Sequence, residues 1–279
     1  MNYENFLGRC ETVHDWVDAS FLADAAAVLD VALPADGSMP PLWHWMMFKT
    51  WARPAALRAD GGAVGEGFLP PFQHLPRRLA AGGRLEFRRP LRVGEAVQRT
   101  SRIHRIQDKE GRTGPLVLLT ILRTFTVGDE VVLQEEQDVV YMQEGAPVAR
   151  PDAAAPVAAP EVPAHALVRS CKGDPLTLFR YSALTANSHR IHYDLEYARG
   201  VEGFAGLVVH GPLQATWLAA LASSIDPTKR IVSMEFRNLG AAYHTDDLLA
   251  AAWDDKGAVR LDLRKGGAAP CMTGTVTLG

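Results

Sequence analysis

The sequence has few cysteines, no long hydrophobic run and little excess charge of either sign. Its three cysteines, Cys10, Cys171 and Cys271, are odd in number and far apart. That usage is typical of reduced thiols inside a cell and does not suggest a disulfide framework. No segment approaches the ~18 uninterrupted apolar residues that a membrane-spanning helix needs, so we expect no membrane partner.

The N-terminus and the net charge narrow the class further. Residues 1–10 lack the basic segment and the following apolar segment of a secretory signal, so we predict a cytoplasmic protein. A formal net charge of −3 argues against a nucleic-acid partner. The composition, with 47% hydrophobic and 22% charged residues, is that of an ordinary globular protein. An anionic ligand would therefore need a local cluster of basic residues.

The chain divides near its middle and then repeats. Residues 145–163 are rich in proline and alanine and carry no core residues, which is typical of a linker. Leu85-Glu-Phe-Arg88 recurs as Met234-Glu-Phe-Arg237, and the turn at 108–111 recurs at 254–257. The matching order indicates a duplication. We predict an N-terminal half at 1–144, the linker at 145–163 and a C-terminal half at 164–279.

Each half is expected to be a helix that covers the apolar face of an antiparallel sheet. Residues 11–33 predict a helix with Asp18 or Ser20 as its cap. The aromatic segment 40–48 predicts core that continues into a helix toward Trp51, and 59–75, rich in glycine and proline, predicts a long loop that could serve as a lid or binding loop. Strands are expected at 84–88, 96–107, 116–127 and 131–142, with a hairpin turn at 108–114.

An imidazole and an amide stand close together in the polar stretch 180–194. Neutral His192 can take a proton from water and return it near neutral pH. Asn187 cannot ionise, so its carbonyl would accept from the attacking water, although asparagine here would also suit a turn or a cap. This pair suits the addition or removal of water beside an activated carbonyl.

A helix start follows at His210-Gly211-Pro212. Proline at the first helical position loses no needed N–H, and free amides at a helix start favour a negative charge. The Gly211 N–H is therefore a candidate donor to an oxyanion, an interaction worth ~3 kcal/mol in the transition state. The alternative is a simple helix N-terminus.

Metal and nucleophile sites are less well supported. His189 and His192 form His-x-x-His, but no third ligand stands at a characteristic spacing, so we predict no metal. Ser182 and Ser188 do not stand in a Gly-x-Ser-x-Gly sequence, so the sequence gives little support for a nucleophilic serine.

The six residues Asn187-Ser-His-Arg-Ile-His192 resemble the Asp-x-Asn-Pro-x-His motif of the MaoC-like (R)-specific enoyl-CoA hydratases, with asparagine in place of the aspartate. Further stretches resemble the double hot-dog dehydratases that are similar to mesaconyl-C4-CoA and itaconyl-CoA hydratases. These stretches are Pro41–Trp45, Gly67–Pro71, Leu75–Arg78, Gly82–Phe87 and Glu135–Tyr141.

The resemblance implies an α+β double hot-dog fold with an acyl-thioester tunnel between the halves. It also implies reversible hydration of itaconyl-CoA or mesaconyl-C4-CoA to citramalyl-CoA, with no metal or redox cofactor. His192 would be base and acid, Asn187 would place the water, and the Gly211 N–H would polarise the thioester carbonyl. Candidates for CoA phosphates, a substrate carboxylate or other substrate contacts are Arg190, Arg84, Arg78, Arg77 and His210.

Other functions stay open at this point. They are a dehydratase for monocarboxylic acyl-CoA or acyl-carrier-protein thioesters, a hot-dog thioesterase, and a non-catalytic acyl-thioester binding protein. Each arginine could instead face solvent. A homodimer is plausible by analogy with the fold alone.

Overall fold

A computed structural model describes residues 3–64, 68–72, 74–75, 77–111, 114–143, 161–266 and 269–279. Ten strands form one sheet, and every neighbouring pair is antiparallel. The first five in spatial order are β1 (Cys10–Trp16), β3 (Ala96–Gly111), β4 (Gly114–Val127), β5 (Glu130–Met142) and β2 (Arg77–Phe87). The next five are β7 (Ile231–Asn238), β10 (Pro270–Leu278), β9 (Ala258–Lys265), β8 (Leu248–Asp255) and β6 (Leu167–Cys171).

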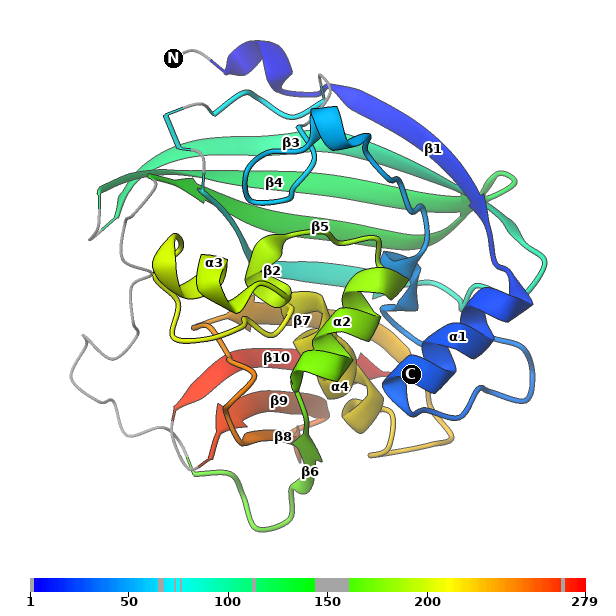
Figure 1. Ribbon diagram of the computed structural model, residues 1–279. Coiled ribbons are helices and arrows are strands. Elements are labelled where there is room, and N and C mark those ends of the chain that lie inside the picture. The colour runs from blue at the N-terminus through cyan, green and yellow to red at the C-terminus, as the bar shows by residue number, and fades with distance from the viewer. Residues whose placement is uncertain are drawn as a thin grey trace.

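The helices lie on one face of this sheet (Figure 1). The α-helices are α1 (Ala19–Leu29), α2 (Pro175–Leu184), α3 (Leu195–Gly200) and α4 (Gly211–Ala222), and the short 3-10 turns are η1 (Glu4–Phe6), η2 (Trp43–Met46), η3 (Pro54–Ala56) and η5 (Arg190–His192). Helix α4 packs against β7 to β10 and buries Leu213, Leu218 and Leu221. It is apolar on most sides because it lies inside the molecule.

The two repeated segments meet at the centre of the sheet. Strands β2 and β7 pair there, with Leu85 directly opposite Met234, and both side chains are 1% exposed. Outward from this seam the strands correspond one for one, and β8 pairs with β9 as β3 pairs with β4. Strands β3 and β4 form the predicted hairpin, but residues 108–111 belong to β3 and not to its turn. The duplication and the α+β double hot-dog fold are confirmed.

The division at 1–144, 145–163 and 164–279 stays a prediction. Residues 144–160, which include most of the proposed linker, lie outside the described residues. The cysteines are free thiols, as expected. No helix in the described part of the chain combines the length and the apolar character that a membrane crossing needs.

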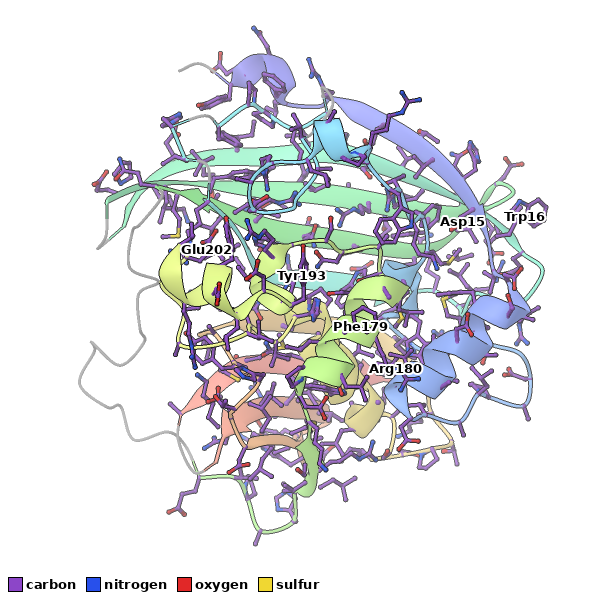
Figure 2. All side chains as sticks on the ribbon, viewed as in Figure 1. Asp15, Trp16, Phe179, Arg180, Tyr193 and Glu202 are labelled. Atoms are coloured by element: carbon purple, nitrogen blue, oxygen red, sulfur yellow. The ribbon has the colours of Figure 1, made fainter. Side chains whose placement is uncertain are left out.

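The helix predicted over 11–33 is wrong at both ends: α1 covers only Ala19–Leu29, and Asp30, with φ 53, ends it. Residues 10–16 form the edge strand β1, whose side chains alternate between exposed and half-buried along its length, and Trp16 stands exposed at its end (Figure 2). Polar and apolar residues alternate here with the period of a strand, and pairing with β3 satisfies the backbone. The predicted cap is confirmed, because the Asp18 carboxylate accepts from the Ser20 N–H at 2.6 Å.

The core prediction for 40–48 is confirmed, since Leu42, Trp43 and Met46 are at most 2% exposed. The predicted continuation toward Trp51 is wrong. The Phe48 N–H donates to the Asp15 carboxylate at 2.6 Å, and Phe48 has φ 54. A helix cannot continue through a residue in that conformation, so η2 ends and Trp51 is exposed.

The strand predictions hold, with longer strands than expected. Strand β2 begins at Arg77, seven residues before the predicted start. The described part of 59–75 contains no helix or strand, so this long loop is confirmed.

Candidate active site

The stretch from 180 to 194 folds as a helix end, a turn and a single 3-10 turn. After α2 ends, Ala186 takes φ 51, and the Asn187 N–H donates to the Ser182 carbonyl at 2.8 Å. The Asn187 side-chain oxygen accepts from the His189 N–H at 3.0 Å. The Asn187 oxygen therefore stabilises a turn, which is the alternative function that the sequence offered for this residue. Its side-chain NH₂ has no protein partner among the described residues.

His192 is held in one tautomer. Its Nδ1 lies 2.7 Å from the Val208 carbonyl oxygen, to which it donates, and the Val208 N–H donates to the Ile191 carbonyl at 2.9 Å. The proton on Nδ1 leaves Nε2 with a free lone pair. Burial lowers the pKa of His192 to about 3, and the bond to Val208 offsets part of this effect. The ring is neutral at physiological pH and can act as a base.

A second buried imidazole lies flat against the first. The rings of His192 and His210 are 3.6 Å apart between centroids and 18° from parallel. His210 Nε2 lies 2.9 Å from the hydroxyl oxygen of Ser182 on α2. Burial lowers the pKa of His210 well below its usual value, and the neighbouring His192 lowers it further. Two stacked neutral rings thus bring α2, η5 and the start of α4 together.

Gly211 is the first residue of α4, as the sequence predicts, and follows His210 directly. Its N–H has no acceptor among the described residues, because it precedes the first turn of intrahelical bonds. The Asn238 side chain lies against it, since a Cβ on Gly211 would be 3.3 Å from Asn238 Nδ2. Asn238 in turn donates to the Ala80 carbonyl at 2.9 Å. The helix start is therefore fixed to both halves of the sheet.

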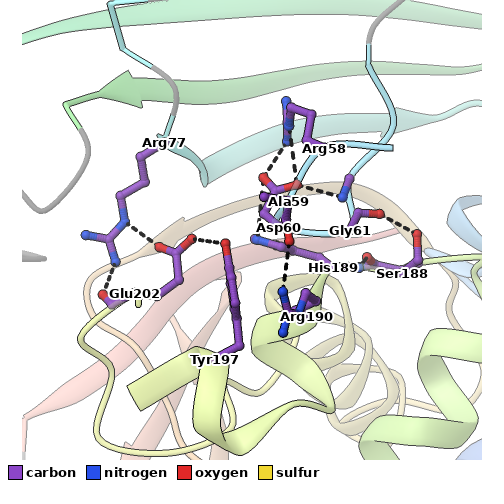
Figure 3. Close-up of polar contacts among 12 residues, drawn as sticks. Arg58, Ala59, Asp60, Gly61, Arg77, Ser188, His189, Arg190, Tyr197 and Glu202 are labelled. Atoms are coloured by element: carbon purple, nitrogen blue, oxygen red, sulfur yellow. Dashed lines mark hydrogen bonds and ion pairs between the residues drawn. The ribbon is translucent and has the colours of Figure 1, made fainter. Parts of the chain in front are cut away.

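A loop from the N-terminal half packs on the 187–192 segment (Figure 3). The Ser188 hydroxyl donates to the Gly61 carbonyl at 2.6 Å, and the Arg190 N–H donates to the Asp60 carbonyl at 2.8 Å. Gly61 has φ +82, and a Cβ there would overlap the Ser188 carbonyl. This contact requires glycine at position 61.

The same loop brings a carboxylate to the histidines. Asp60 Oδ2 lies 4.0 Å from His189 Nε2, and the His189 ring stands edge-on to His192 with centroids 5.7 Å apart. Burial lowers the pKa of His189, while Asp60 opposes the shift. Sequence reasoning missed Asp60, because a single aspartate in a glycine-rich loop gives no signal of its tertiary neighbours.

Three of the four candidate arginines already have protein partners. Arg190 pairs with Asp194 at 2.7 Å, and its guanidinium lies 4.0 Å from the centre of the Tyr197 ring. Arg77 donates to the Glu202 carbonyl at 3.1 Å, as Figure 3 shows. Arg84 pairs with Glu136 and with Asp138, at 2.8 Å each. These partners account for the position of each guanidinium without a ligand.

Arg78 differs from those three. It is exposed and has no ion pair or hydrogen bond among the described residues. It stands opposite Tyr141 in the register of β2 and β5, and its charge helps to lower the pKa of His189. Arg78 is thus a charge close enough to His189 to affect its pKa, and within the described part of the chain it remains available to an anion.

A cavity of about 540 Å³ runs beside the C-terminal half of α4. Its wall includes Trp43, His44, Thr216 and Trp217. Thr216 is five residues beyond Gly211, so this wall begins ~7.5 Å along the helix from its start. His192 does not line this cavity, which lies along the later turns of α4. Within the described ranges, no three His, Cys, Asp or Glu side chains are grouped as a metal site requires.

The fold and the site together define a class: double hot-dog proteins with a buried neutral imidazole beside the start of the central helix. Residues 42–244 match the hydroxyacyl-thioester dehydratase type 2 family. The chain is 39% identical over 278 residues to the mesaconyl-C4-CoA hydratase of Chloroflexus aurantiacus, covering 98% of this chain and 97% of that protein. The chain belongs to this family of MaoC-like hot-dog dehydratases and is a hydro-lyase that hydrates and dehydrates acyl thioesters.

Solved structures agree on the fold. HtdX of Mycobacterium tuberculosis superposes with a TM-score of 0.68 at 21% identity, covering 97% of this chain and 100% of that chain. A MaoC-like dehydratase from Phytophthora capsici superposes with a TM-score of 0.72 at 15% identity, covering 100% of this chain and 98% of that chain.

Proposed function

We propose that this protein reversibly hydrates an enoyl-CoA whose acyl group carries a second carboxylate, as in mesaconyl-C4-CoA or itaconyl-CoA, to give citramalyl-CoA. The observation that carries the proposal is His192, with its proton on Nδ1 and its Nε2 lone pair free. The relative from Chloroflexus, named for mesaconyl-C4-CoA, supports the dicarboxylic class.

In the hydration of mesaconyl-C4-CoA, whose C=C bond is conjugated with the thioester, His192 Nε2 takes a proton from water as the water oxygen adds to the β-carbon. The electron pair of the C=C bond moves toward the thioester oxygen, where the Gly211 N–H stabilises the developing charge. The imidazolium then returns its proton to the α-carbon, so the base is regenerated. Asn187 has a free amide NH₂ that could orient the water or the substrate, while its oxygen is engaged by the turn.

Arg78 is the residue that would meet the second carboxylate. An unpaired guanidinium can hold a carboxylate through charge-assisted hydrogen bonds. The other three candidates would have to exchange an existing partner for the substrate. Arg190, for example, is already paired with Asp194, so Arg78 is the contact to test.

The test of the reaction is a panel of enoyl-CoAs incubated with the protein and a thiol reagent. Loss of the enoyl absorbance without release of free CoA is expected. Release of CoA would indicate a thioesterase, and binding without either change would indicate a non-catalytic module. Equal rates with crotonyl-CoA and with the dicarboxylic substrates would contradict the proposed substrate class.

Arg78→Met tests the carboxylate contact. We expect KM for mesaconyl-C4-CoA or itaconyl-CoA to rise about tenfold or more, since a charge-assisted bond is worth ~1.5–3 kcal/mol. Turnover of crotonyl-CoA should be unchanged. Arg102→Met, which removes an exposed arginine from β3, is the matched control. An equal loss with both substrate classes would assign Arg78 to the CoA moiety.

A further inference from the structure

We propose that His210 supplies the second hydrogen-bond donor to the thioester oxygen, through its Nδ1–H, and that Ser182 holds His210 in the required tautomer. This inference rests on the proposed function, because it concerns the same substrate carbonyl. It assigns a carbonyl-polarising role to a histidine and a positioning role to a serine.

The first observation is an unpartnered atom. His210 is 1% exposed, and its Nδ1 is buried with no hydrogen-bond partner among the described residues. Leaving such an atom unpaired costs free energy in the folded protein. A ligand atom that completes the bond explains why this polar ring occupies a buried position.

The second observation is the neighbouring backbone donor. His210 is the N-cap of α4, so its ring belongs to the residue directly before Gly211, whose N–H also has no acceptor within the described part of the chain. Oxyanion sites commonly combine several donors aimed at one oxygen. The helix start contributes partial positive charge at the same place.

The tautomer follows from Ser182. Its hydroxyl lies 2.9 Å from His210 Nε2 and has no other acceptor among the described residues. The simplest arrangement has the Ser182 O–H donating to Nε2, which places the ring proton on Nδ1. A neutral imidazole in such a tautomer can polarise a carbonyl without giving up its proton.

The stack with His192 gives the two rings different tasks. Because the centroids of the two rings are only 3.6 Å apart, both imidazoles would be within reach of one short conjugated unit of the substrate. His210 would bind the carbonyl oxygen while His192 transfers the proton at the carbon atoms. His210 must stay neutral for this, because a second positive ring would oppose the charge that His192 acquires.

Two substitutions at position 210 separate this role from simple packing. His210→Phe keeps a flat ring against His192 but removes the donor. His210→Asn loses the ring but places an amide N–H close to the position of Nδ1. We expect His210→Phe to lower kcat by about 10²- to 10³-fold, with His210→Asn retaining at least ten times more activity than His210→Phe.

Binding of a chromophoric arylacryloyl-CoA measures carbonyl polarisation without turnover. Its absorbance should shift to the red in the wild-type protein and in His210→Asn, and the shift should be much smaller in His210→Phe. Ser182→Ala, which acts from a different helix, should also reduce the shift, because Nε2 is then free to carry the proton.

Several results would overturn the proposal. One is a red shift and a kcat in His210→Phe within a few-fold of the wild type. Another is an equal loss in His210→Phe and His210→Asn when both have wild-type thermal unfolding. An unchanged shift in Ser182→Ala would remove the positioning role. If the wild type hydrates no enoyl-CoA, the proposed function itself is wrong. The results above, obtained with an active wild type, would contradict only the roles of His210 and Ser182.

Discussion

At the scale of single residues, the site is a group of buried neutral imidazoles. His192 has its Nδ1 engaged by Val208 and its Nε2 free, and His210 lies against it. If His192 transfers the proton, His192→Ala should lose at least ~10²-fold in kcat. Initial rates of enoyl-CoA hydration measure this. His14→Ala, at an exposed position on β1, is the control and should keep its activity. Full activity in His192→Ala would refute the assignment.

The same histidines make stability depend on pH. The pKa values of His189, His192 and His210 are all lowered by burial. Below a pH of ~6.5, the unfolded chain binds protons that the folded chain does not. We therefore expect Tm to fall between pH 7 and pH 5, as the free energy of unfolding decreases by up to ~1.4 kcal/mol per pH unit for each histidine. The slope should be smaller in His210→Phe. A Tm that does not change across this window would contradict the burial argument.

At the scale of elements, the loop at 58–62 holds the 187–192 segment in place. The contact depends on Gly61, which has φ +82 and no room for a Cβ beside Ser188. Gly61→Ala should lower both Tm and kcat, because the loop must withdraw from the segment that carries His192. Gly37→Ala is the matched control, since Gly37 has φ +69 but nothing within 4 Å of a Cβ. Both substitutions carry a backbone cost of ~1 kcal/mol. Equal effects on kcat would show that the loop contact does not matter for activity.

At the scale of the whole molecule, the two halves share one core across the seam of β2 and β7. Leu85 and Met234 pair at its centre and are both 1% exposed. Leu85→Ala should lower the free energy of unfolding by ~2–5 kcal/mol, as for other large-to-small core changes. Urea unfolding should show a single transition that moves to lower urea concentration. Val93→Ala, at a 45% exposed position, should have little effect. Two separate transitions would mean that the halves unfold independently.

The sequence by itself determined the duplication and four strands of the N-terminal half, and its resemblance to the double hot-dog dehydratases implied the fold class. The strands and the duplication depend on local patterns: the alternation of side chains along strands and the repeated Leu85–Arg88 and Met234–Arg237 segments. It also identified His192 and Gly211 as candidates, since imidazole chemistry and a helix start can be read from neighbouring residues. The helix prediction failed at 11–16, because these residues pair with β3. It failed again after Met46, because the Asp15 carboxylate accepts from the Phe48 N–H and holds the chain out of a helix.

The tertiary structure alone decided which side chains meet. It brought Ser182 to His210 and Asp60 to His189, and it paired Arg190 with Asp194, whereas Arg78 has no ion pair or hydrogen bond among the described residues. The contacts of Ser182 with His210 and of Asp60 with His189 join residues 28 and 129 positions apart, and no local pattern encodes them. The tautomer of His192 depends on one backbone carbonyl, that of Val208, whose position is set by packing around the start of α4. A site made of buried neutral groups is defined by its partners, and partners are assigned only when the chain is folded.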